Sequence, residues 1–256
     1  MLSSQDSVWY LYEQVYEDIR NECLASNVLF TDDQFRAEPA SFYRNYDGMK
    51  PRPRLEWLRP GEITDSPKFI SDGISRFDTV QGTVGNCWFV SALTNFARLQ
   101  ENDHRMFAQV VPDEQNFEEN YAGIFRFRFW QYGQWVEVVV DDQLPTSSGV
   151  LASLKSSDDN EFWAPLLEKA YAKLSGSYGA LSGGLGSEAY VDFTGTISEL
   201  YRQPFPEEFY QRLSAAHDTN AFIGCIYEVG FLQLSNSSGR FFYSYGILYS
   251  GVKDKK

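Results

Sequence analysis

The segment Gln81–Phe89 carries the residue types that a nucleophilic cysteine needs. It reads Gln-Gly-Thr-Val-Gly-Asn-Cys-Trp-Phe, and an amphipathic run follows at residues 90–99. If this run is a helix, the Cys87 sulfur lies at its positive end, where unpaired N–H groups favour the thiolate. The two glycines let a substrate approach the backbone closely, and Gln81 provides an uncharged donor for an oxyanion. A buried structural cysteine is the alternative and the commoner environment of a lone free cysteine, but the flanking Gln81 and glycines shift the interpretation toward catalysis.

Composition limits the class of protein. The chain has 256 residues, 43% of them hydrophobic and 16% aromatic, which is enough to bury the core of one large or two small domains. Its formal net charge of -13 argues against nucleic acid or an anionic membrane as the main partner. Three cysteines are too few, and odd in number, for a disulfide framework. No apolar run has transmembrane length, so we expect a soluble, cytoplasmic protein.

Hydrophobic patterning predicts the elements that position Cys87. Apolar residues at helical spacing predict helices near residues 6–25, 86–100, 162–175 and 206–215. Strict alternation over residues 124–130, a Tyr132-Gly133 turn and a second run at 135–140 predict a hairpin. After residue 200 the composition changes, and residues 222–234 and 241–252 are expected to form strands of a second, β-rich unit.

Long blocks of the sequence resemble the calpains, which are intracellular calcium-dependent papain-like cysteine proteases. These blocks are residues 81–88, 120–125, 129–142, 144–146, 161–163, 166–174, 176–178, 181–184 and 192–195. The resemblance implies an α+β, papain-like calpain protease core. It divides the chain into an N-terminal helix at 1–30, an extended segment packed on the core at 31–66, a Cys-bearing first subdomain at 67–198, and part of a β-rich second subdomain at 199–256.

The resemblance also implies roles for residues near the cysteine. Cys87 would be the nucleophile, and the Gln81 side chain would join the Cys87 backbone N–H as oxyanion donors. Trp88 would line the cleft beside the thiol.

A regulatory calcium ion is implied as well. Asp78 and Glu161 would supply carboxylates, and Ser71 and Gly73 would supply backbone carbonyls. Ca²⁺ takes six to eight oxygen ligands and accepts this mixture. Without the resemblance, the two acids would be interpreted as surface charges.

The resemblance fails at the catalytic base. A thiol protease needs a proton acceptor, normally an oriented histidine. The chain has only His104 and His217, and neither lies in the Gly-His-Ala-Tyr-Ser pattern of the family. That pattern falls on residues 246–250, so Ile247 occupies the histidine position. The family's asparagine segment and second calcium site would lie beyond Lys256, and members of such a unit act together, so we expect little or no turnover.

Three functions remain open at this point. The first is a calcium-dependent endopeptidase of intracellular proteins, of which this chain is a fragment or splice product. The second is a non-catalytic, calcium-binding regulatory or interaction module of calpain descent. The third is a structural scaffold with neither calcium nor thiol chemistry. The sequence specifies neither the substrate preference nor a regulatory subunit.

Overall fold

The computed structural model describes residues 8–45, 53–71, 73–74, 79–97, 104–202, 204–218, 222–228 and 244–251. Within these residues the protein is of the α+β class, as the sequence predicts, and its strands form three separate three-stranded sheets.

The N-terminal region differs from the single helix expected near residues 6–25. It contains β1 (Trp9–Tyr10), the 3₁₀ helix η1 (Leu11–Glu13) and α1 (Tyr16–Ser26). Tyr12 and Glu13 have φ values of 56° and 58°, which interrupt a right-handed helix. The short strand β1 instead pairs in parallel with β4 (Gln134–Asp141), so its backbone groups find partners in a sheet.

The next segment packs along the core. It contains α2 (Pro39–Phe42), β2 (Glu56–Leu58) and α3 (Pro60–Ile63). Phe35 and Phe42 lie in the main hydrophobic core. Strand β2 pairs with β5 (Leu144–Ser147), which in turn pairs with β6 (Val150–Leu151), in antiparallel order β2-β5-β6.

The predicted hairpin is confirmed. Strand β3 (Ile124–Gln131) pairs with β4 in antiparallel register, from Ile124 opposite Asp141 to Gln131 opposite Gln134. Tyr132 and Gly133 have φ values of 52° and 87°, as a two-residue hairpin turn of the primed type requires. The alternating side chains Phe125, Phe127 and Phe129 are buried in the core.

Helices cover the hairpin. They are α4 (Cys87–Ala97), α5 (His104–Val110), α6 (Trp163–Ser175), η3 (Tyr178–Leu181) and α7 (Gly186–Thr194). The predicted helix near 162–175 is confirmed as α6, with Pro165 in its first turn, where a missing N–H is tolerated. The predicted helix at 86–100 is confirmed as far as Ala97, and residues 98–103 lie outside the described part.

The last part of the chain forms a separate sheet. It contains β7 (Ile197–Arg202), α8 (Phe209–Asp218), β8 (Phe222–Glu228) and β9 (Ser244–Gly251), with the antiparallel order β7-β9-β8. Helix α8 begins three residues later than expected, because Phe209 N–H closes a turn on the Pro206 carbonyl at 3.0 Å. The expected strand residues beyond β8 and β9 lie outside the described part.

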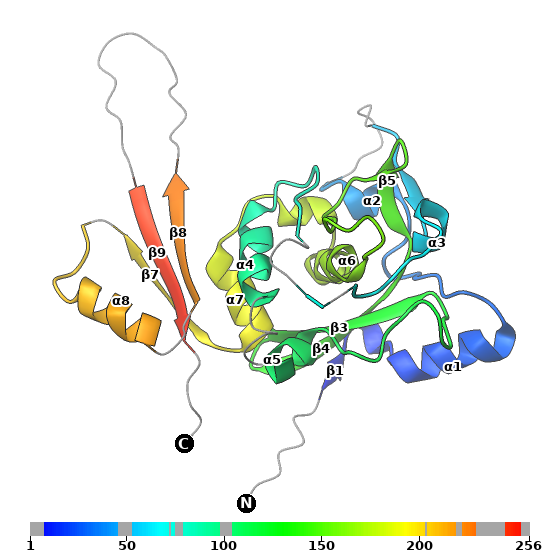
Figure 1. The fold of residues 1–256 in the computed structure, drawn as a ribbon, viewed down its shortest axis with the longest axis horizontal. Coiled ribbons are helices and arrows are strands. Elements are labelled where there is room, and N and C mark those ends of the chain that lie inside the picture. The colour runs from blue at the N-terminus through cyan, green and yellow to red at the C-terminus, as the bar shows by residue number, and fades with distance from the viewer. Residues whose placement is uncertain are drawn as a thin grey trace, which may run out of the picture.

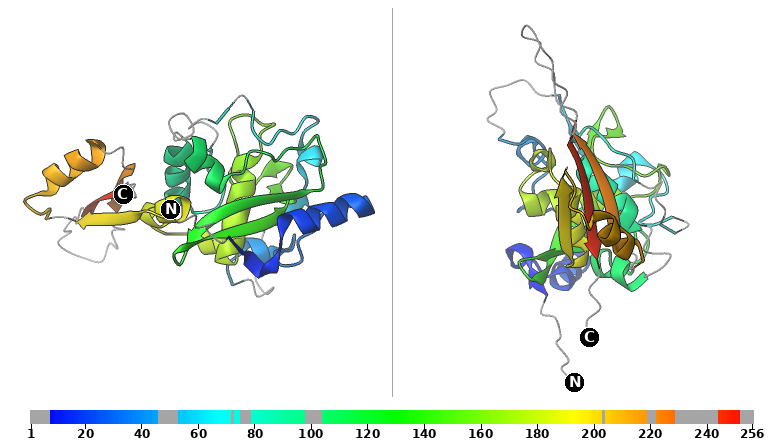
Figure 2. Two further views of the ribbon diagram at one scale, coloured as in Figure 1. Left: turned by 90° about the horizontal axis from the view of Figure 1, so that it is seen from below. Right: turned by 90° about the vertical axis from the view of Figure 1, so that its left-hand side faces the viewer.

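Figure 1 shows how these elements are arranged. The hairpin lies beneath α6, with α4 and α7 on one side of α6 and the β2-β5 strands on the other. The β7-β9-β8 sheet and α8 stand beside α4 and α7 in Figure 1 and in the left view of Figure 2, and α7 contacts β7 and β9. Helix α7 therefore packs against both α4, the Cys-bearing helix, and the β7-β9-β8 sheet. In the part of the chain that the structure describes, no helix has the length and apolar character needed to cross a membrane.

Candidate active site

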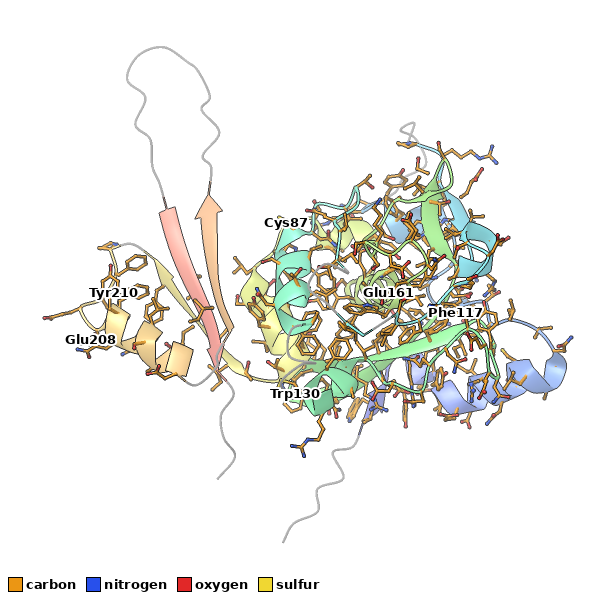
Figure 3. The ribbon with its side chains drawn as sticks, in the orientation of Figure 1. Cys87, Phe117, Trp130, Glu161, Glu208 and Tyr210 are labelled. Atoms are coloured by element: carbon orange, nitrogen blue, oxygen red, sulfur yellow. The ribbon has the colours of Figure 1, made fainter. Side chains whose placement is uncertain are left out.

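Cys87 is the first residue of α4, and its side chain is exposed. Apolar side chains on one face of the helix point into the core, where Phe89, Leu93 and Phe96 are each 0% exposed. Figure 3 shows Cys87 at the upper end of this helix. The alternative of a buried structural cysteine is therefore wrong for Cys87, whereas it describes Cys23, which is buried.

The start of α4 leaves N–H groups near the thiol. The Asn86 carbonyl accepts the first hydrogen bonds of the helix, from Phe89 N–H at 2.9 Å and from Val90 N–H at 3.1 Å. An α-helix supplies no carbonyl for the N–H groups of its first residues, here Cys87 and Trp88. The Cys87 sulfur therefore lies beside backbone N–H groups that have no carbonyl partner within the helix.

Gln81 lies in the loop that leads to Cys87. Its side-chain Nε2 donates to the Val84 carbonyl at 2.8 Å, which orients the amide and leaves its second N–H directed elsewhere. The loop is held by Val80 N–H, which donates to the Lys155 carbonyl at 2.7 Å. Thr83 N–H likewise donates to the Ala152 carbonyl at 2.8 Å. The proposed oxyanion donor is thus tied to the body of the protein on both sides.

Gly82 is required for this close packing. A Cβ at residue 82 would lie 2.1 Å from the Ser153 carbonyl oxygen, a distance that no side chain can occupy. The sequence predicts that a substrate approaches the backbone closely at such a glycine, but at Gly82 the Ser153 carbonyl of the protein itself takes that place.

Trp88 is half-buried beside Cys87. Its indole Nε1–H donates to the Leu181 carbonyl at 2.8 Å. Gly183 N–H donates to the Gly85 carbonyl at 3.0 Å. The segment 181–184 therefore holds the Cys87 loop in addition to residues 152–155.

Beneath the loop lies a buried carboxyl group that hydrophobic patterning did not predict. Asn86 and Glu168 are both 0% exposed, and Asn86 Nδ2 donates to Glu168 Oε1 at 2.6 Å. Leu154 N–H donates to Glu168 Oε2 at 2.7 Å. Burial raises the pKa of Glu168 to about 7, and the hydrogen bonds from Leu154 and Asn86 oppose this rise.

The implied calcium ligands are partly brought together. Glu161 is buried, and its Oε1 accepts Ser71 N–H at 2.7 Å while its Oε2 accepts the Ser156 hydroxyl at 2.7 Å. Gly73 lies two residues beyond Ser71, with φ of 88°. Asp78 lies outside the described residues. The structure thus places the Ser71 backbone against the Glu161 carboxylate.

A pocket of about 280 Å³ opens beside Glu161. Cys87 is not among its lining residues, which are Ile63, Thr64, Gly149, Val150, Leu151, Lys155, Ser156, Asp158, Asp159 and Glu161. Figure 3 likewise shows Cys87 and Glu161 well apart. Among the described residues, which do not include Asp78, no cluster of three His, Cys, Asp or Glu side chains could hold a metal ion.

Ile247 lies in β9, the central strand of the β7-β9-β8 sheet. Its backbone is opposite Tyr201 of β7 and Cys225 of β8. His104 begins α5 and His217 lies in α8, and the side chains of both histidines are outside what the structure describes.

Comparison with known proteins places the chain in a family. The model of the calpain family cysteine proteases matches residues 30–241, a range that ends before Ile247. Calpain-A of Drosophila melanogaster is 49% identical over 86% of this chain and 26% of its own length. Calpain clp-1 of Caenorhabditis elegans is 48% identical over 84% of this chain and 27% of its own length.

The Calpain-2 catalytic subunit of Mus musculus is 45% identical over 89% of this chain and 32% of its own length. The chain thus spans about a quarter to a third of the length of the curated relatives it matches. Identity at this level, together with a family match over most of the sequence, leaves one conclusion. The chain belongs to the calpain family of cysteine proteases.

Proposed function

We propose that this chain carries the cysteine half of a papain-like peptidase site, in which Cys87 attacks peptide bonds of proteins. The observation that carries the proposal is the exposed thiol at the first residue of α4, a helix whose core-facing side chains are fully buried. A structural cysteine has no need of such exposure at a helix start, whereas a nucleophile has.

The proposed roles follow from the loop geometry. The Cys87 sulfur forms a bond to the substrate carbonyl carbon, and the carbonyl π electrons move to its oxygen. The Gln81 amide, oriented by Val84, and the Cys87 backbone N–H would donate to that oxygen. In a complete site, a base would take the thiol proton and return it to the amine as the carbon–nitrogen bond breaks, and water would then hydrolyse the thioester. Trp88, fixed by Leu181, would line the substrate cleft.

This chain does not provide a general base at the expected position. Ile247 cannot accept the thiol proton, and we propose that it stands where the family has histidine. The chain as it stands is therefore proposed to turn over peptides slowly or not at all, because members of a catalytic unit act together.

We propose Ca²⁺ as the bound cofactor, held by the Asp78 and Glu161 carboxylates and the Ser71 and Gly73 carbonyls. In support, Glu161 Oε1 already accepts a hydrogen bond from Ser71 N–H at 2.7 Å. Carboxylate and carbonyl oxygens are also the ligands that Ca²⁺ prefers. The other carboxylate oxygen of Glu161 accepts the Ser156 hydroxyl at 2.7 Å, so the carboxylate is held between Ser71 and Ser156. When bound, the ion would fix the loop after residue 70 to the start of α6.

The second candidate function is a non-catalytic, calcium-binding regulatory or interaction module. The replacement at Ile247 favours it, since a binding module has no use for a proton acceptor. In either case we propose intracellular proteins as substrates or partners, in the cytoplasm. The acidic net charge of -13 opposes nucleic acid in both roles.

Two measurements test the nucleophile and its turnover. Iodoacetamide labelling, read at each cysteine by peptide mass spectrometry, should modify Cys87 faster than Cys23 or Cys225, and equal rates would contradict an activated thiol. A peptide-cleavage assay with and without calcium should give no turnover above the Cys87→Ala variant. Calcium-dependent turnover that Cys87→Ala abolishes would instead exclude the non-catalytic module.

The Ile247 position has its own test. Ile247→His should raise turnover only in part, because an imidazole without an orienting partner is a weak base. Full activity in this variant would show that the orienting role is filled by another residue of the chain.

A further inference from the structure

Glu168 connects the residue before Cys87 with one of the segments that hold the Cys87 loop. One carboxylate oxygen accepts Asn86 Nδ2, and Asn86 is the residue directly before Cys87. The other oxygen accepts Leu154 N–H, within the segment whose carbonyls at Ala152 and Lys155 anchor the Gln81 loop. A single buried side chain therefore bridges the helix start that carries the thiol and the segment that holds the oxyanion donor.

We infer that Glu168 is a positioning residue for Cys87 and acts through its hydrogen bond to Asn86. The inference rests on the proposed nucleophilic role of Cys87. The Asn86 carbonyl accepts the first two N–H groups of α4, from Phe89 and Val90, so the place of Asn86 sets where the helix begins. A shift of Asn86 would therefore move the Cys87 sulfur and the first N–H groups of α4 together.

The surroundings of Glu168 argue against a role in packing alone. A carboxyl group with no exposed surface is expensive to bury, and a leucine at this place on α6 would fill the same space without that penalty. Three buried polar atoms nearby have no hydrogen-bond partner among the residues that the structure describes: Asn86 Oδ1, Ser153 Oγ and the Tyr178 hydroxyl. Tyr178 faces both Glu168 and Ser153, although its contact with Ser153 lacks normal hydrogen-bond geometry.

These unpartnered atoms show which substitution should conserve the function. Glutamine at residue 168 can accept Leu154 N–H with its carbonyl oxygen. Its NH₂ can donate to Asn86 Oδ1 once the Asn86 amide turns over, and that oxygen has no donor at present. Leucine at residue 168 offers neither bond. The tyrosine that faces this group, Tyr178, has a pKa raised well above its ordinary value by burial, so it stays neutral and adds no competing charge.

The test is the rate of Cys87 alkylation by iodoacetamide at pH 7, read site by site by mass spectrometry. Glu168→Leu and Asn86→Ala should each slow alkylation about tenfold, the loss of one buried hydrogen bond of ordinary strength. The alkylation rate of Glu168→Gln should stay within about twofold of the wild-type rate, because this variant keeps the same number of hydrogen bonds. The double variant Glu168→Leu/Asn86→Ala should be no slower than either single variant, because both act through one bond.

A matched control separates positioning from general loss of stability. Val111→Ala truncates a fully buried side chain next to α5 and should lower stability without slowing Cys87 alkylation. Wild-type alkylation of Cys87 no faster than that of Cys23 would overturn the proposed nucleophile and this inference with it. A fast wild-type rate that persists in Glu168→Leu, additive effects in the double variant, or equal slowing by Val111→Ala would overturn the inference alone. If Glu168→Leu does not fold, Asn86→Ala measured against Glu168→Gln decides by the same criteria.

Discussion

The indole ring of Trp88 lies directly against the backbone of Gly184. A Cβ at residue 184 would stand 2.5 Å from the indole Cε2 and 2.8 Å from its Cδ2. The indole Nε1–H also donates to the Leu181 carbonyl at 2.8 Å. Together these contacts fix the ring of Trp88, the residue after Cys87, against residues 181–184, a segment that begins at the last residue of η3. Glycine is therefore needed at residue 184 because it has no side chain, and the position of the Trp88 indole is fixed.

Gly184→Ala is expected to displace the Trp88 ring. The added methyl group overlaps ring atoms that cannot retreat without breaking the hydrogen bond to Leu181. Overpacking of this kind destabilises by about 1–3 kcal/mol. Denaturant unfolding measures the loss, and tryptophan fluorescence should report the moved indole. Gly61→Ala is the matched control, because a Cβ at residue 61 meets nothing within 4 Å; if both variants unfold alike, the contact with Trp88 does not constrain residue 184.

Glu168 should make stability depend on pH. Burial raises its pKa to about 7 in the folded protein, against an ordinary value of 4.5. The folded state therefore holds the proton more tightly than the unfolded state. The stabilisation from protonation is fully present below pH 4.5 and is lost as the pH rises to about 7. The gap between the two pKa values corresponds to about 3 kcal/mol.

Glu168→Gln removes this titration. The free energy of unfolding of wild type, relative to that of the variant, should fall by up to about 3 kcal/mol between pH 4.5 and pH 7 and then level off. Asp192→Asn offers a comparison, because burial raises the pKa of Asp192 to about 6. The free energy of unfolding of wild type relative to Asp192→Asn should therefore stop falling near pH 6. A difference between wild type and Glu168→Gln that stays constant with pH would show that the carboxyl is not buried in the folded state.

Periodic apolar patterns predicted the elements near the site well. The stripe Phe89, Leu93 and Phe96 predicted the face of α4 that turns to the core, and all three side chains are fully buried. The alternation over residues 124–130 predicted β3, since every second side chain enters the core. Exposure of Cys87 was consistent with the residue types around it, which are polar or small on one side and apolar on the other.

The polar contacts beneath the site did not follow from the sequence. Glu168, Lys169 and Lys173 are almost fully buried on α6, although a charged residue in a helix pattern is normally read as a solvent-facing one. Their partners are far apart in sequence, for example Asp32 for Lys173 and Asp141 for Lys169. A pattern within one helix carries no information about such partners, so burial of a charge is visible only once the chain is folded.

The buried pair Lys173–Asp32 should be important for stability. Both side chains are 0% exposed, and Lys173 Nζ lies 2.6 Å from Asp32 Oδ2. Burial lowers the pKa of Lys173, and the charge of Asp32 opposes that effect. Asp32→Asn should lower the free energy of unfolding by about 3–5 kcal/mol, because it leaves a buried ammonium without its counter-charge.

Two comparisons isolate the charge effect in a denaturant titration. The double variant Asp32→Asn/Lys173→Met should be more stable than Asp32→Asn alone, since the unpaired charge is then gone. Glu17→Gln removes a carboxylate that is 54% exposed and lies 4.0 Å from Arg20 and 3.8 Å from Arg126, and it should change stability by less than about 1 kcal/mol. Equal losses from Asp32→Asn and Glu17→Gln would show that burial does not govern the strength of the Lys173–Asp32 pair.

Calcium should stabilise the folded chain through Glu161. A ligand that binds only the folded state adds about 2.7 kcal/mol at a concentration one hundred times its Kd. Thermal unfolding with calcium should therefore show a rise in Tm that Glu161→Gln removes, because glutamine keeps the Ser71 hydrogen bond but loses the negative charge. Asp159→Asn is the matched control: this exposed acid lines the same pocket, and its variant should keep the rise. An unchanged wild-type Tm across calcium concentrations would count against the proposed ion. A rise that survives Glu161→Gln but disappears in Asp159→Asn would move the ion into the pocket, away from Ser71.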